Sequence, residues 1–169
     1  ALSPPLEAII TILEFGAVAR DSNLPLYDVL ATGGRSSSEL AFVALQLVGA
    51  NDQATVGLLM HKLHSGTWDE RRLAVEMLGD MAPASRTAIP LLVEASCYWD
   101  DPDLRKTAVK ALACFGPEAS EGVPRLVRFL KSNNREAQCR ALDVLEHLGP
   151  SCEDAVPPVR GMLADPDPS

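Results

Sequence analysis

The stretch FGPEASEGVP, residues 115–124, occurs again with the same offsets as LGPSCEDAVP at residues 148–157 and as MAPASRTAIP at residues 81–90. In each copy a proline stands eight residues after a marker position that holds Gly or Ala. The markers continue upstream in step, at positions 16, 49, 82, 116 and 149, so the period is 33–34 residues. Self-similarity at such a period is typical of repeat architectures.

Three further columns follow the same period. An alanine stands eight residues before each marker, an Ile or Leu four before it, and a Leu or Val ten after it. The members are Ala8, Ala41, Ala74, Ala108 and Ala141; Ile12, Leu45, Leu78, Leu112 and Leu145; and Leu26, Leu59, Leu92, Leu126 and Val159. Because the columns are uniform in type, the sequence predicts five copies of one structural unit.

Each unit is predicted to hold two antiparallel helices, named helix A and helix B. Ala108, Leu112 and Phe115 lie at i, i+4 and i+7, which is one face of an α-helix. The marker glycine can adopt the left-handed conformation that ends helix A, and the proline after it cannot continue that helix. Helix B begins near Pro124, since proline is tolerated in a first turn. Small alanines allow neighbouring helices to approach closely.

The sequence therefore predicts an all-α fold, a right-handed α-solenoid of about five two-helix repeats in a single domain over residues 1–169. A final Asp165-Pro166-Asp167 resembles the start of another helix A, and the first residue is not Met. We expect a processed or excised piece of a longer chain. The predicted units are residues 1–33, 34–66, 67–99, 100–133 and 134–165.

The units resemble HEAT repeats, especially the short HEAT-like type first noted in phycobilin lyases. The resemblance lies in Asp69-Glu70-Arg71-Arg72-Leu73-Ala74 and in Asp103-Leu104-Arg105-Lys106, each followed by the helical Leu and by Gly-Pro or Ala-Pro. It implies a scaffold that holds a partner protein along a concave surface lined by the B helices. In that family an Asp and an Arg of successive units form a ladder. Arg71 and Arg105 match the Arg column, but Ser38 and Gln138 replace it in neighbouring units.

Composition limits the functions open to the chain. The net charge is −8, from 15 Lys and Arg against 23 Asp and Glu, which argues against nucleic acid as a partner. No apolar run has the length of about 18 residues that a membrane span needs. Four cysteines without C-x-x-C spacing suit a reducing compartment, so we expect a cytoplasmic protein. A signal peptide removed from the start of the chain remains an open alternative.

No set of residues points to catalysis. His61 and His64 are spaced i, i+3 in the second helix B, where they could share a metal, but no third ligand is suggested nearby. A polar inner face explains them better. Nothing beyond Arg140 beside Cys139 suggests an activated thiol. We therefore expect no enzyme, no metal and no cofactor.

A basic cluster on the fourth helix B is the strongest candidate for binding. Residues 100–133 carry six Lys and Arg against five Asp and Glu, whereas the whole chain is acidic. Arg125, Arg128 and Lys131 are spaced i, i+3, i+6, and Arg160 occupies the adjacent column of the next unit. Glu94 and Tyr98 share a face of the third helix B. These residues, with His61 and His64, predict a surface for a protein or peptide carrying an acidic or phosphorylated segment.

Two enzymatic alternatives follow from the resemblance. A phycobilin lyase-like enzyme or chromophore carrier would need a pocket for a tetrapyrrole with anionic propionates. A HEAT-like DNA glycosylase would need a basic cleft lined by aromatic residues, which the net charge and the few aromatics disfavour. A solvated helix face is the simplest competing explanation for the basic cluster.

Overall fold

The computed structural model describes residues 29, 35–47, 53–149, 157 and 160. The described residues form α-helices and short 3-10 helices, with no strand among them, which confirms the predicted all-α fold. Within this part of the chain no helix is both long and apolar enough to cross a membrane. The elements are α3 (Arg35–Leu47), α4 (Gln53–Ser65), α5 (Trp68–Asp80), η2 (Arg86–Ala88), α6 (Ile89–Cys97), α7 (Pro102–Cys114), η3 (Gly116–Gly122), α8 (Val123–Leu130) and α9 (Arg135–Leu148).

The chain divides into two compact units, Ala1–Met77 and Leu78–Ser169. The first contains α3, α4 and most of α5, and the second contains the last turn of α5 and everything described after it. The predicted repeat at residues 1–33 lies outside the described residues, apart from position 29. The number of repeats and the single domain therefore stay predictions.

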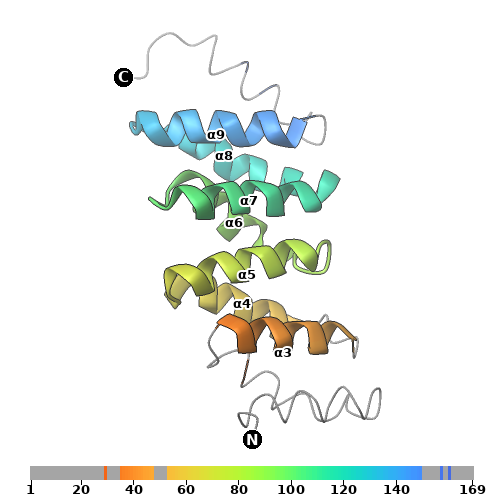
Figure 1. Cartoon of the computed structure of the whole chain (residues 1–169). Helices are drawn as coiled ribbons and strands as arrows, with labels where there is room; N and C mark the ends of the chain where they lie inside the picture. Colours follow the sequence, from red (N-terminus) through yellow and green to blue (C-terminus); the bar gives the residue numbers. More distant parts are fainter. Residues whose placement is uncertain (1–28, 30–34, 48–52, 150–156, 158–159, 161–169) are drawn as a thin grey trace, which may run out of the picture. The chain divides into compact units, whose positions relative to one another are not determined.

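In the second unit the helices form two layers (Figure 1). Helices α7 and α9 lie side by side nearer the viewer, with α6 and α8 behind them. Helix α6 packs against α7, α8 and α9, and α8 packs against α9. These are the predicted A helices in one layer and B helices in the other, stacked as a solenoid requires.

The repeated columns form the core of these layers. Along helix A of the fourth unit, Ala108, Leu112 and Phe115 are buried, as are Ala74, Leu78 and Met81 at the same positions of the third. Leu92 and Leu126, the helix-B column, are inaccessible to solvent. The period read from the sequence thus selects the residues that pack between layers.

The helix ends follow the predicted signals. Gly116 and Gly149 have φ of 56° and 50°, the left-handed region that ends α7 and α9 with little strain. The side chain of Asp101 accepts hydrogen bonds from the first turn of α7, and that of Asn134 does the same for α9. Pro90 and Pro124 lie in the first turns of α6 and α8, as predicted.

The Arg column has a local role at the junction between a B helix and the next A helix. Arg71 donates from Nε to the Gly66 carbonyl at 2.8 Å, and Arg105 donates from Nη1 to the Trp99 carbonyl at 2.9 Å. Gln138, which replaces the Arg, donates from Nε2 to the carbonyls of Ser132 at 2.7 Å and Leu130 at 3.1 Å. Each side chain therefore satisfies carbonyls left open where a helix B ends.

Gln138→Ala is expected to lower the free energy of unfolding by about 1 kcal/mol, because two partly buried carbonyls lose their donor. Gln138→Arg restores the residue type found in the preceding units and is expected to stay within about 0.5 kcal/mol of the wild type. Urea unfolding followed by circular dichroism measures both. Equal losses in the two variants would contradict the capping role.

Candidate functional site

The predicted residues of α6 and α8 lie on one surface, called here the α6–α8 surface, which comprises Glu94, Tyr98, Arg125, Arg128 and Lys131. Arg125 joins the two helices, since its Nη1 lies 2.9 Å from Oε1 of Glu94 and donates to the Pro90 carbonyl at 3.0 Å. Arg125 therefore has a packing role, and its charge is balanced by Glu94. The basic cluster predicted from the sequence reduces to Arg128 and Lys131 as exposed cations.

Tyr98 lies one helical turn beyond Glu94, at the end of α6, and its side chain is 65% exposed. Arg128 lies three residues beyond Arg125 on α8. Tyr98 and Arg128 therefore both lie toward the C-terminal end of their helices, beyond the Glu94–Arg125 pair. Exposed aromatic and arginine side chains are common among binding hot spots.

The other predicted residues are placed separately. His61 and His64 are exposed on α4 in the first unit, where the Ser65 hydroxyl lies 3.2 Å from Nε2 of His61. Arg160 is helical and exposed. Over residues 35–47 and 53–149, no three His, Cys, Asp or Glu side chains are grouped as a metal site would require.

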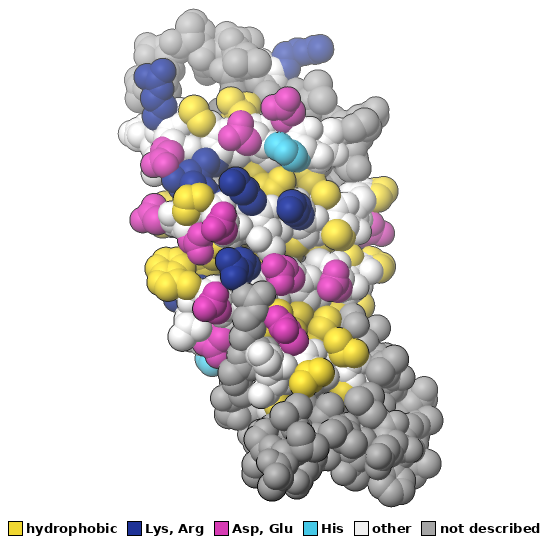
Figure 2. All heavy atoms as spheres, in the orientation of Figure 1, with side chains coloured by type: hydrophobic (Ala, Val, Ile, Leu, Met, Phe, Trp, Pro, Cys, Tyr) yellow, Lys and Arg dark blue, Asp and Glu magenta, His cyan; other side chains and the backbone are white. Residues whose placement is uncertain are grey.

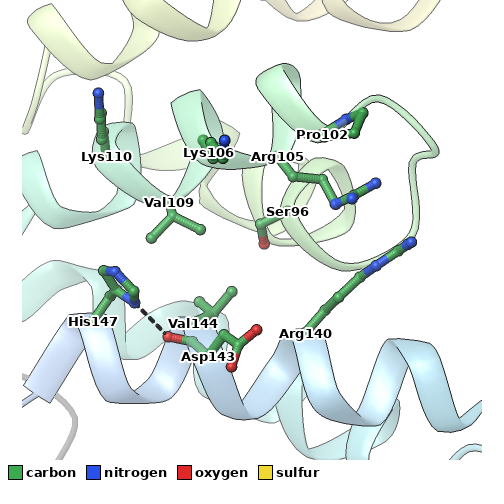
Figure 3. Close-up of a pocket in the computed structure, with 10 residues that line it drawn as sticks. All are labelled: Ser96, Pro102, Arg105, Lys106, Val109, Lys110, Arg140, Asp143, Val144 and His147. Atoms are coloured by element: carbon green, nitrogen blue, oxygen red, sulfur yellow. Dashed lines mark hydrogen bonds between the residues drawn. The ribbon is translucent and has the colours of Figure 1, made fainter.

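A groove lies between α7 and α9, on the helix-A side of the second unit. It has a volume of about 350 Å³ and is called here the α7–α9 groove. Val109 and Val144 point toward each other across it, and Ser96 of α6 points into the same space (Figure 3). Its lining consists of Ser96, Pro102, Arg105, Lys106, Val109, Lys110, Arg140, Asp143, Val144 and His147.

Positive charge surrounds the apolar floor of the groove. Figure 2 shows Lys, Arg and His side chains gathered where α7 faces α9, with acidic side chains around them. Arg105, Lys106 and Lys110 come from α7, and no carboxylate of the described residues forms an ion pair with any of them. Their charge is therefore uncompensated within the part of the chain that the structure describes.

The α9 side of the groove is more nearly neutral. Arg140 donates to the Cys97 carbonyl at 3.1 Å and pairs with the carboxylate of Glu136 one turn earlier. Asp143 adds a carboxylate, and its own backbone carbonyl lies 2.8 Å from Nδ1 of His147 (Figure 3). The α7 side of the groove thus contributes three cations and no carboxylate to the lining.

The cysteines offer no activated nucleophile at this site. Cys97 is fully buried behind the groove, and burial raises the pKa of its thiol, although Ser96 and Arg140 act in the opposite direction. Such a thiol stays protonated at neutral pH and is a poor nucleophile. Cys114 and Cys139 are exposed free thiols, and Cys152 lies outside the described residues.

Sequence reasoning missed the α7–α9 groove because it assigned the basic excess of residues 100–133 to helix B alone. Three of the six cations, Arg105, Lys106 and Lys110, are on helix A instead. The signal was available: Lys106 and Lys110 are spaced i, i+4 on α7 and so lie on one face. The groove itself depends on the separation of α7 and α9, which no spacing within one repeat reveals.

Stacked pairs of helices with a repeated core define a helical-repeat protein, and the comparisons specify its type. Residues 98–169 match the family model described as HEAT repeats. This match begins directly after α6, includes all of α7, α8 and α9, and supports a HEAT-like repeat protein. HEAT repeats are generally protein-interaction scaffolds, and the family is typically non-catalytic. A search of curated proteins found no match to the chain.

Proposed function

We propose that the protein is a non-catalytic scaffold that binds a partner protein or peptide along the B helices, at the α6–α8 surface. The partner's contacting segment would be acidic or phosphorylated, because Arg128 and Lys131 are exposed cations on that surface. The observation that carries the proposal is the Glu94–Arg125 ion pair, which fixes two successive B helices as one continuous surface.

The composition of the surface supports binding rather than simple solvation. Tyr98, at the end of α6, is a large aromatic side chain that is 65% exposed. A large, rigid aromatic side chain provides contact area with little loss of conformational entropy. Arg128 and Lys131, one turn apart at the end of α8, would add long-range attraction and orientation for an anionic segment.

The test is affinity capture from native lysate with mass-spectrometric readout, comparing the wild type with Arg128→Glu/Lys131→Glu. Arg125 is left unchanged, since Arg125→Glu would face Glu94 with a second carboxylate and disturb the packing of α6 on α8. The variant is expected to lose at least about 90% of the captured partner, equivalent to a tenfold loss of affinity or more. Its helicity by circular dichroism should equal that of the wild type, because both substituted side chains are exposed.

The matched control is Arg86→Glu/Arg135→Glu, which changes the net charge by the same amount at two exposed residues outside the α6–α8 surface and the α7–α9 groove. Retention of the partner by this control and its loss from the α8 variant would support the α6–α8 surface. Retention by both variants would overturn the assignment of the surface. Equal loss from both would attribute capture to the overall charge and would also overturn it.

A further inference from the structure

The α7–α9 groove lies in the layer opposite the B helices of the second unit, so the scaffold function proposed above does not use it. We propose that it is a second binding site, which takes an acidic peptide segment of a partner protein. In this arrangement an apolar side chain of the segment rests on Val109 and Val144. Carboxylates on either side of that residue meet the cations of α7.

The floor of the groove provides the apolar half of this recognition. Val109 is half-buried and Val144 is 1% exposed, and the two come from different helices that face each other. The volume of about 350 Å³ suits a side chain rather than a folded domain. Covering an apolar side chain of the size of leucine contributes about 1.5–3 kcal/mol. The buried Ser96 hydroxyl donates to the Val93 carbonyl at 2.8 Å, so it presents no unsatisfied donor to the floor.

The rim provides the charged half. Lys106 and Lys110 are exposed and one turn apart on α7, which places their Cβ atoms roughly 5–6 Å apart. Figure 3 shows the Lys110 side chain extending away from α9, so its ammonium meets a bound segment by turning toward the groove. Alternate side chains of an extended peptide are about 6.6 Å apart on the same side, so two carboxylates spaced i, i+2 match the two lysines. The residue between them points the other way, toward the floor. The geometry thus fits the pattern Glu-Leu-Glu.

Charge complementarity explains why the segment is acidic and how it is oriented. Arg105 also lines the groove, and its guanidinium is hydrogen bonded to the neutral carbonyl of Trp99 and not to a carboxylate. Asp143 on the opposite wall repels a carboxylate, which leaves the α7 side as the favourable one. Although the chain as a whole carries −8, charges beyond about 8 Å are largely screened at physiological salt. The local positive field therefore decides which ligand enters.

The test is an NMR titration of the full chain with the pentapeptide Glu-Glu-Leu-Glu-Glu, complemented by fluorescence anisotropy. We expect saturable binding with a Kd of about 0.1–1 mM at the amides of α7 and α9. Amide shifts on α8 report binding at the α6–α8 surface and are fitted as a separate site. Peptides with Gly in place of Leu, or with Gln in place of every Glu, are each expected to bind about tenfold more weakly. Lys106→Glu/Lys110→Glu is expected to weaken binding of the first peptide about tenfold or more.

The matched control here is Arg86→Glu/Arg135→Glu, which makes the same change of charge at two exposed residues outside both proposed sites and should keep the Kd within about twofold. Equal weakening by Lys106→Glu/Lys110→Glu and by this control would overturn the site, because binding would then follow the overall charge. Absence of saturation at millimolar peptide would also overturn it. So would tighter binding of inorganic phosphate or of an RNA oligonucleotide at the same amides. Lys106→Glu/Lys110→Glu and Arg128→Glu/Lys131→Glu separate this proposal from that for the α6–α8 surface, since each site has its own sensitive variant.

Discussion

Replacing Glu70 with alanine is expected to lower the free energy of unfolding by about 3 kcal/mol at neutral pH. The reason is Lys62, a residue that is 5% exposed and whose Nζ lies 2.9 Å from Oε1 of Glu70. Without the carboxylate this buried ammonium loses its contact with Glu70. Oε2 of Glu70 also accepts the backbone N–H and the hydroxyl of Thr67, both at 2.8 Å, which closes a capping box at the start of α5.

The pH dependence of the free energy of unfolding tests the contact between Lys62 and Glu70 independently. The pKa of Glu70 is lowered from 4.5 to about 2, chiefly by the hydrogen bond from Lys62 and then by those from Thr67. Because the folded protein holds the proton more weakly than the unfolded chain, this contribution is complete above about pH 4.5 and is lost as the pH falls toward 2. The Glu70 side chain is 24% exposed, so solvent screening reduces the size of the effect.

Glu70→Gln isolates this titration, since an amide keeps the shape of the carboxylate but has no proton to gain. The stability of the wild type is expected to exceed that of Glu70→Gln above about pH 4.5 and to converge with it near pH 2. Urea unfolding at a series of pH values measures the difference. A difference that stays constant with pH would contradict the assigned role of the carboxylate.

A double variant controls for the buried charge. Lys62→Met removes the ammonium group but keeps a chain of similar length, so Lys62→Met/Glu70→Ala should be more stable than Glu70→Ala by about 1–2 kcal/mol. The capping box is lost in both proteins, and the gain therefore measures the cost of burying the ammonium without the Glu70 carboxylate. No gain in the double variant would show that the capping box, and not the ion pair, dominates.

The helices and the core of the second unit could be predicted from the sequence because one period controls both. The residue eight positions before each marker must be small, and Ala108 and Ala141 are inaccessible to solvent. The marker must end a helix, and Gly116 and Gly149 have the required positive φ. Periodicity repeats the same physical constraint several times, so a single chance substitution such as Ala82 does not hide it.

Side-chain partners could be predicted less well, because they depend on contacts between repeats. The spacing of Arg125 on helix B predicts an exposed cation available to a partner, but Arg125 pairs with Glu94 of the preceding helix B. Gln138 interrupts the arginine column in the sequence, but its side-chain amide donates to a carbonyl at the end of a helix B, as the arginines of the column do. In each case the deciding partner lies outside the local motif.

The α7–α9 groove shows the same limit for function. Lys106 and Lys110 are visible in the sequence as a pair on one helix face. Whether these lysines border a groove depends on Val144, which belongs to the next repeat and forms the other half of the groove floor. A repeat protein builds its surfaces from residues about one period apart, so the sequence of one unit specifies only half of each groove.

Gly79→Val is expected to lower the free energy of unfolding by about 3 kcal/mol, through the packing of the last turn of α5 on α7. A Cβ at position 79 would lie 3.0 Å from both the Cα and the Cβ of Ala111. Neither atom can rotate away, so the two helices must separate and lose part of their dispersion contacts. Gly79→Ala is expected to cost less, because the better helix propensity of alanine offsets about 1 kcal/mol of the strain.

Gly57 of α4 provides the matched control, since a Cβ there would meet nothing within 4 Å. Gly57→Val is expected to be neutral or stabilising by a few tenths of a kcal/mol, because valine has the higher helix propensity. Ala111→Gly in the Gly79→Val background removes one of the two clashing atoms and should recover part of the loss, even though glycine costs about 1 kcal/mol in a helix. Urea unfolding of these variants measures each step. If Gly79→Val and Gly57→Val changed stability equally, close approach at Gly79 would not be what holds α5 against α7.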